Sequence, residues 1–304
     1  MHQHSHGKAL SWSTAVTLAF VAVELGAGVG AHSLALISDS GHNFTDALAL
    51  ILAAAAQRLE SRPADDRKTY GYQRAGVLAA FVNALALLAL SAIIFWEAWF
   101  RLFNPPEVND TTMAVVALAG IAVNVGIMMA LHRGRHDLNI RAAWVHMLGD
   151  AVSSAAIVAG AVVIHFTGWH RIDPALSICI GVLIIWTAWD IIRESLNVLL
   201  EGIPQGMNLK AISNAIQTVP GVIDVHDLHV WTLGAGAHAL SCHVLIDDMP
   251  PSESNTILLR INEALCAFHI HHSTVQFEHV RCALSDAPCA MPPGVHQHPH
   301  EHSH

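Results

Sequence analysis

The chain contains 304 residues, of which 53% are hydrophobic and only 13% are charged. Soluble domains carry about 25% charged residues, so this composition excludes an ordinary soluble enzyme and a disordered chain. The formal net charge of -9 argues against a nucleic-acid partner. Histidine is the second unusual feature, because the 23 histidines outnumber the 15 lysines and arginines. A membrane protein rich in a common metal ligand is the first expectation.

Six apolar runs are long enough to cross the roughly 30 Å hydrocarbon core of a bilayer as helices. The first run contains Glu24 and is followed almost at once by the second, so we expect a span there and not a cleaved signal peptide. The expected transmembrane helices cover residues 9–30, 34–57, 76–100, 112–132, 143–165 and 174–193.

The basic residues around these runs predict the orientation. Ten lysines and arginines flank one side of the six runs, and two, Arg101 and Arg171, flank the other. Because cytoplasmic loops carry the excess of basic residues, both termini are expected in the cytoplasm. The ten are Lys8, Arg58, Arg62, Arg67, Lys68, Arg74, Arg133, Arg135, Arg141 and Arg193.

The composition changes after the sixth run. An amphipathic helix is predicted over 207–219 and a second one over 252–268, with strands over 222–231, 239–246 and 273–280. This α-β-β-α-β order is typical of a small ferredoxin-like α+β sandwich. The expected organisation is a histidine-rich tail over 1–8, a six-helix transmembrane domain over 9–202, a cytoplasmic α+β domain over 203–284 and a disordered histidine-rich tail over 285–304.

Two predicted spans carry the same motif, H-x-x-x-D. The second span contains His42 and Asp46, and the fifth contains His146 and Asp150. Residues four apart lie on one helix face, so each helix presents one imidazole and one carboxylate. Asp39 lies on the face of His42, where it either supports a ligand or lies near the membrane surface.

Two such faces together supply four ligands, a number and type suited to tetrahedral Zn²⁺. Two carboxylates balance one divalent cation, and two neutral histidines add no charge. Without metal, the same groups favour protons, so metal and protons compete for them. We therefore expect a metal/proton exchange site formed by these four residues.

At these residues the chain resembles the cation diffusion facilitator family, and it is similar to the bacterial zinc-efflux branch, the ZitB/CzcD-like proteins. The resemblance covers about residues 10–282. Its motifs, in chain order, are Ser33-Leu34-Ala35-Leu36, Asp39-Ser40-Gly41-His42 with Asp46, Thr69-Tyr70-Gly71-Tyr72-Gln73-Arg74, Val82-Asn83-Ala84, Asn139-Ile140-Arg141-Ala142-Ala143, His146 with Asp150, Gly168-Trp169, Asp173-Pro174, Val225-His226-Asp227-Leu228-His229-Val230-Trp231 and Thr274-Val275-Gln276-Phe277-Glu278.

The resemblance implies a homodimeric antiporter of the bacterial cytoplasmic membrane that exports Zn²⁺ in exchange for H⁺. It assigns the transport role to the two H-x-x-x-D pairs, and histidine on both spans favours zinc. Cadmium and cobalt are not excluded by this ligand set. Where relatives commonly carry Glu after the Thr69–Ala75 motif, this chain has Gly76, which puts a metal role for that loop in doubt.

The resemblance also implies zinc bound by the cytoplasmic domain. By motif position the candidates are His226, His243 and His279, with Glu278 and Cys282 as additions. His243 and His279 fall on separate predicted strands and His226 near the start of the first, so surface histidines remain the alternative. His229 and His238 are weaker candidates.

Three other classes of function agree less well with these residues. An intramembrane metalloenzyme requires an open metal position and a general base, and no H-E-x-x-H motif is present. A metal sensor leaves the four intramembrane ligands without a role. A channel conflicts with four tight ligands, which hold a divalent ion too long for channel flux.

The remaining histidines and the cysteines carry less information. The five cysteines have no paired C-x-x-C spacing, so a reducing compartment is expected. His132 and His136 lie in a basic loop, as either loop ligands or solvated side chains. The tail histidines either capture metal or have no essential role; they are His2, His4, His6, His296, His298, His300, His302 and His304.

Overall fold

The computed structural model describes residues 3–131, 138–234 and 236–280. The candidate ligand Cys282, the loop histidines His132 and His136, and the C-terminal histidines lie outside the described residues. The chain divides into two compact units, which are described separately: Met1–Arg62 with Leu78–Ser195, and Pro63–Val77 with Leu196–His304.

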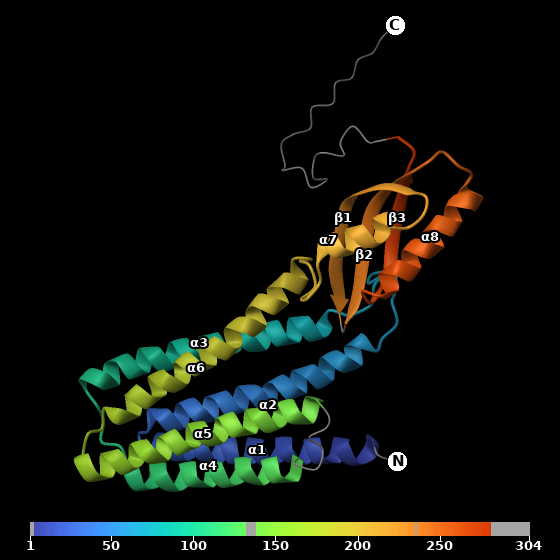
Figure 1. Ribbon diagram of the computed structural model, residues 1–304. Helices are drawn as coiled ribbons and strands as arrows, with labels where there is room; N and C mark the ends of the chain where they lie inside the picture. Colours follow the sequence, from blue (N-terminus) through green and yellow to red (C-terminus); the bar gives the residue numbers. More distant parts are fainter. Residues whose placement is uncertain (1–2, 132–137, 235, 281–304) are drawn as a thin grey trace. The chain divides into compact units, whose positions relative to one another are not determined.

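Six long helices follow one another in the N-terminal two thirds of the chain (Figure 1). Four of them, α3 to α6, are long and apolar enough to cross a membrane by length and composition, and α1 contributes a shorter apolar segment, Ala15–Gly30. Helix α2 is less apolar because Asp39, His42 and Asp46 interrupt its apolar sequence. The helices are α1 (Gln3–Gly30), α2 (Leu34–Glu60), α3 (Ala75–Phe103), α4 (Asp110–Leu131), α5 (Leu138–Thr167) and α6 (Ile172–Leu199).

Helices α1, α2, α4 and α5 pack against one another, with α2 in contact with both α1 and α5. Small residues permit close packing, which is the main source of helix association in a bilayer. Gly120 on α4 lies against Phe20 of α1 and Ser154 of α5, and Gly181 on α6 lies against the ring of Phe95 on α3. The six helices therefore form one helical membrane domain, as the six apolar runs predicted.

The start of α2 is held by a residue of α6. Asp173 is fully buried, and its carboxylate accepts hydrogen bonds from Ser33 Oγ at 2.5 Å, from Leu34 N at 2.7 Å and from Ala35 N at 3.2 Å. The first N–H groups of a helix have no partner within the helix and attract negative charge. Asp173 thus satisfies two of them and fixes the beginning of the helix that carries His42 and Asp46.

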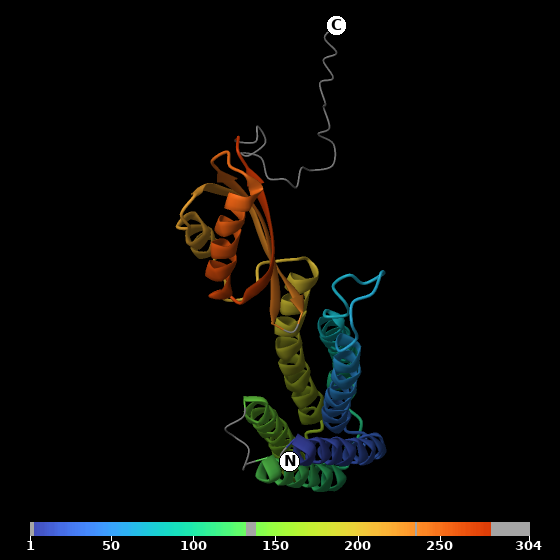
Figure 2. The same cartoon turned by 90° about the vertical axis from the view of Figure 1, so that its right-hand side faces the viewer.

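The C-terminal unit has the predicted α-β-β-α-β order, which is confirmed. Its three-stranded sheet has the strand order β1-β2-β3, with β1 and β2 antiparallel and β2 and β3 parallel. Both helices cover the same face of the sheet (Figure 2). The elements are α7 (Leu209–Gln217), β1 (Val222–Gly234), β2 (Ala237–Ile246), α8 (Pro251–Cys266) and β3 (Ile270–Glu278).

The core of this unit lies between the sheet and the two helices. Ile212 of α7 and Ile261 of α8 are fully buried against Leu240 and Val244 of β2. Because side chains alternate along a strand, the residue between Cys242 and Val244 points to the other face. His243 therefore lies on the sheet face that the helices leave uncovered.

The segment between α2 and α3 belongs to the same unit as the sheet. Arg74 forms an ion pair with Glu201 at 3.3 Å and donates to the carbonyl of Thr232 at 3.2 Å. The ring of Tyr70 meets that of His272 edge-on, with centroids 5.4 Å apart. Side chains from residues far apart in the sequence thus hold this segment against β1 and β3.

Candidate metal centres

The first candidate centre lies in the membrane domain, where α2 and α5 face each other. On α2, His42 Nε2 is 3.4 Å from Asp46 Oδ2, and on α5, His146 Nε2 is 3.6 Å from Asp150 Oδ2. These are the two H-x-x-x-D pairs, each one helical turn long. The local spacing alone accounts for these two contacts.

The two pairs also meet across the helices. His146 Nε2 lies 3.3 Å from Asp46 Oδ2, and His42 Nε2 lies 3.9 Å from Asp150 Oδ1. The two imidazole rings are 6.1 Å apart between centroids and nearly perpendicular. Imidazole nitrogens and carboxylate oxygens therefore alternate around one centre.

The distances between neighbouring donors are close to those of a tetrahedral metal site. Zinc bonds of about 2.1 Å separate all donors of a tetrahedron by about 3.4 Å, and the four distances between neighbouring donors here are 3.3–3.9 Å. The ligand atoms of these residues do not all lie within 4.8 Å of one another, so the side chains would draw closer together around a bound ion. Asp46 Oδ2 and His42 Nδ1 are buried without a hydrogen-bond partner. A buried carboxylate oxygen between two imidazole nitrogens is suited to a cation, because a cation offers the partner that it lacks.

Asp39 does not join these four donors. Its carboxylate accepts hydrogen bonds from Ser153 Oγ at 2.8 Å and Ser154 Oγ at 3.4 Å, so it connects α2 to α5 one turn away from His42. On the other side, Asn43 Nδ2 donates to Glu24 Oε2 of α1 at 3.4 Å. Glu24 is fully buried at this position. The sequence did not predict this contact, because Glu24 is a lone carboxylate in an apolar run.

The second candidate centre lies on the uncovered face of the C-terminal sheet. His226 of β1 and His243 of β2 are direct neighbours in the antiparallel register, and Glu278 follows at the end of β3. His226 Nε2 is 3.2 Å from Glu278 Oε2, and His243 Nδ1 is 2.9 Å from Glu278 Oε1. Among the described residues, these three are the group whose ligand atoms all lie within 4.8 Å of one another.

Two polar atoms of this centre are buried and have only their ion-pair contact. His226 Nε2 and Glu278 Oε2 lie 3.2 Å apart, and neither forms a further hydrogen bond. Asp227, which the sequence did not single out, brings Oδ2 within 3.7 Å of His243 Nε2. Its φ of +50° places it in a left-handed conformation beside an irregularity of β1, and strand periodicity does not predict that position.

The other histidine candidates lie elsewhere in the C-terminal unit. His279 is exposed just after β3 and is outside the group of three. His229 pairs with Asp227 at 2.8 Å, and His238 lies 3.4 Å from Thr232 Oγ1. Burial lowers the pKa of His238, and neighbouring His269 lowers it further.

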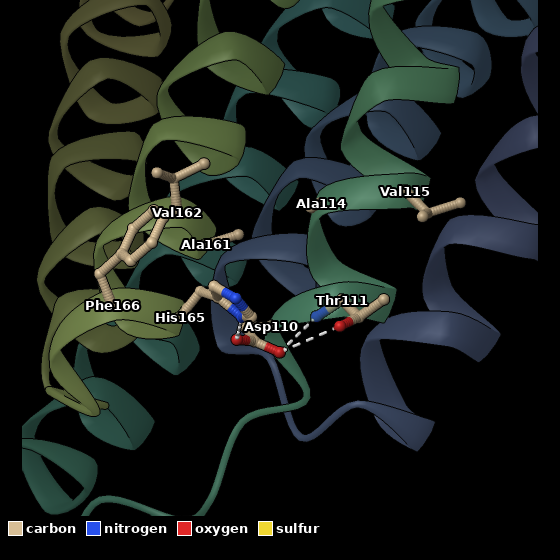
Figure 3. A pocket seen from close by; sticks show the side chains of 8 residues that line it. All are labelled: Asp110, Thr111, Ala114, Val115, Ala161, Val162, His165 and Phe166. Carbon is tan, nitrogen blue, oxygen red and sulfur yellow. Dashed lines mark hydrogen bonds and ion pairs between the residues drawn. The ribbon is translucent and has the colours of Figure 1, made fainter.

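A third group of polar residues lies where α4 begins and α5 ends. His165 Nδ1 lies 2.8 Å from Asp110 Oδ2, and Figure 3 shows the two side chains pointing toward each other. The pocket beside them is otherwise lined mostly by apolar side chains such as Val162 and Phe166. One imidazole and one carboxylate are too few for a closed metal site, so this pair is a contact between the two helices.

The fold and the two centres define an integral membrane protein with a C-terminal α+β domain and ligand sets suited to a divalent metal. Comparison with protein families gives the particular class. Residues 10–200 match the cation efflux transmembrane domain, and residues 204–280 match the cytoplasmic domain of cation efflux proteins. The chain belongs to the cation efflux family, as its motifs predicted.

Several bacterial proteins are similar over most of their length. The metal cation efflux system protein CzcD of Cupriavidus metallidurans is 38% identical over 292 residues, which is 94% of this chain and 92% of that protein. The zinc transporter ZitB of Pectobacterium atrosepticum is 38% identical over 92% of this chain and 90% of its own. The cadmium, cobalt and zinc/H⁺-K⁺ antiporter of Bacillus subtilis is 34% identical over 99% of both chains.

Proposed function

We propose that this protein is a secondary transporter that exports Zn²⁺ from the cytoplasm in exchange for H⁺. The observation that carries the proposal is the alternating set of His42, Asp46, His146 and Asp150, with neighbouring donors 3.3–3.9 Å apart. The relatives named as zinc transporters and as a zinc/H⁺-K⁺ antiporter support the substrate and the coupling.

The chemistry of the four groups explains why protons are exchanged. A metal ligand must be deprotonated, so binding of zinc releases protons from the same side chains and binding of protons releases zinc. Asp46 Oδ2 lies within 3.4 Å of both imidazoles. A proton on any one of these groups therefore competes directly with the ion. Alternate exposure of such a site to the two sides of the membrane is sufficient for antiport.

Ligand chemistry also bears on the range of metals. Nitrogen and oxygen donors in a tetrahedral arrangement suit Zn²⁺, while affinity order alone does not exclude Cd²⁺ or Co²⁺. A relative named for cadmium, cobalt and zinc supports this wider range.

The C-terminal domain is proposed to bind a second zinc ion, which regulates the transporter instead of being carried. His226, His243 and Glu278 would hold it, with Asp227 adjacent to His243. Three donors whose ligand atoms lie within 4.8 Å of one another resemble an incomplete tetrahedron. The domain is also proposed to be the site of homodimer formation. The excess of basic residues in the loops on one side supports a cytoplasmic position, in a bacterial cell, for this domain and for both termini.

Transport into sealed proteoliposomes tests the proposal. With the membrane potential clamped and a pH gradient imposed, we expect zinc to move against the direction of proton movement. Asp46→Ala and Asp150→Ala should each abolish zinc movement while the protein still inserts. Asp190→Ala, an exposed carboxylate on α6, is the matched control and should transport normally. Full zinc flux in both site variants would disprove the site, and flux indifferent to pH would disprove the exchange.

A further inference from the structure

A second pair of carboxyl groups lies beside the candidate transport site and has no part in the four-ligand set. Glu24 of α1 and Asp39 of α2 share a side-chain hydrogen bond. Their exposed fractions are 0% and 1%. In the described part of the chain, neither forms an ion pair with a lysine or arginine, because the arginine ion pairs there involve Glu97 and Glu201.

Two carboxyl groups in contact and shielded from water cannot both be ionised, so one proton must lie between them. The neighbouring donors indicate how it is distributed. Asp39 accepts from two hydroxyls, those of Ser153 and Ser154, which favours its ionised form. Glu24 receives one long hydrogen bond, from Asn43, and its Oε1 is buried without a donor. Glu24 is therefore the member that carries the proton and donates to Asp39.

The ionisable surroundings of the pair are few. The charge of Asp150 on α5 acts on Glu24, and His42 is one helical turn from Asp39 on α2. Helix α4 also packs against α1, but its charged residue Asp110 is at the helix start and pairs with His165. The nearest charges thus belong to the transport site, so a change of charge there acts directly on the proton of the pair.

The geometry points to the Glu24–Asp39 pair as a second proton-binding site of the transporter, separate from the metal ligands, that carries one of the exchanged protons. This inference rests on the proposed zinc/proton exchange. With its proton the pair has one negative charge and joins α1 to α2. Without it, two carboxylates repel each other across the same contact. Loss and recovery of one proton therefore alternately weaken and restore the α1–α2 contact beside the site.

The test measures how many protons move per zinc ion. Proteoliposomes with equal potassium on both sides and valinomycin have zero membrane potential. The zinc gradient at which net flux stops is then measured at several pH gradients, and its logarithm rises with the pH difference with a slope equal to the number of protons per zinc. We expect Glu24→Gln, whose amide still donates to Asp39, to lower this slope by one proton. Asp39→Asn should do the same.

Glu97→Gln is the matched control, because Glu97 is a carboxylate of α3 paired with Arg101 and away from the site. Its slope should equal that of the wild type. A wild-type slope of zero would disprove the exchange itself. A normal wild-type slope that neither Glu24→Gln nor Asp39→Asn changes would overturn only the second proton site.

Infrared spectroscopy of the wild-type protein decides the matter even if a variant fails to insert. Zinc-free protein at pH 7 should show the carbonyl band of a buried protonated carboxylic acid. This band should persist when Asp46→Ala and Asp150→Ala remove the carboxyl groups of the transport site, and it should be lost when Glu24→Gln is added. Absence of that band from the wild type would overturn the inference.

Discussion

Asp173 of α6 accepts a hydrogen bond from Ser33, the residue that caps the beginning of α2, and the two side chains are 140 positions apart in the chain. The same carboxylate accepts two main-chain N–H groups of α2. The helix that carries half of the candidate transport ligands is therefore positioned by a residue of α6, which leads into the C-terminal domain.

Substitution of this carboxylate should weaken both stability and transport. Asp173→Asn keeps the size of the side chain, but it removes the negative charge and replaces one acceptor oxygen by a donor that faces the N–H groups of α2. Hydrogen bonds to charged groups contribute about 1.5–3 kcal/mol each, so we expect a loss of about 2 kcal/mol or more and reduced zinc flux. Thermal unfolding in detergent and proteoliposome flux measure the two effects. Asp190→Asn, exposed on the same helix, should change neither.

Replacement of one imidazole by a carboxylate should change metal selectivity. His42→Asp produces a site with one nitrogen and three carboxylates, which is more negative than the present set and, because a carboxylate binds through one or two oxygens, accommodates a larger ion such as cadmium. We expect transport of cadmium relative to zinc to increase. Competition of the two metals for uptake measures the ratio, with His271→Asp on the exposed part of β3 as control. An unchanged ratio would show that His42 does not select the metal.

The C-terminal centre should bind zinc independently of the transport site. In full-length protein in which Asp46→Ala and Asp150→Ala remove the first centre, calorimetry should still detect one zinc ion per chain. His243→Ala should abolish that binding, because His243 contacts both Glu278 and Asp227. His271→Ala should leave it intact. Retention of the ion in the His243→Ala protein would assign it to other residues.

The thiol of Cys242 should resist modification in the folded domain. Burial, with a smaller effect of the Asp227 charge, raises its pKa to about 12, and only the thiolate reacts. At pH 8 we expect iodoacetamide to modify exposed Cys266 but not Cys242, with the sites located by mass spectrometry. Rapid modification of Cys242 in native protein would contradict its burial.

The same pKa gives a stability prediction at high pH. The unfolded thiol ionises near pH 9, whereas the folded thiol stays protonated until about pH 12. Between these values only the unfolded state loses the proton, so stability of the C-terminal domain should fall as pH rises. Cys242→Ala should reduce this dependence when unfolding is followed by the fluorescence of Trp231, which lies on β1.

Local sequence patterns predicted the helices and the two halves of the membrane centre. Apolar runs identify spans because the bilayer sets their length, and the spacing of His42 from Asp46 fixes a shared helix face. The alternation of side chains within each strand did not show whether His226 and His243 lie on the same face of the sheet. That depends on the register between β1 and β2, which the structure supplies.

Contacts between distant helices were not predictable from one sequence. Glu24 and Asp173 are single carboxylates in apolar runs, and no local spacing indicates that one meets Asp39 and the other the start of α2. β3 begins at Ile270, three residues before the predicted Ser273. The prediction began too late because His271 and His272 are polar and do not continue the strand pattern, although this segment pairs with β2. Whether such a segment forms a strand depends more on its pairing with a neighbouring strand than on the polarity of its own residues.

The register of the hairpin gives the C-terminal centre a further consequence. β1 and β2 pair with three irregularities, and His226 lies opposite His243 between the first and the second of them. A slip of one residue would turn His226 to the helix-covered face. An ion held by both imidazoles is compatible with only one alignment of the strands, so bound zinc would stabilise the observed register of this hairpin against a slip.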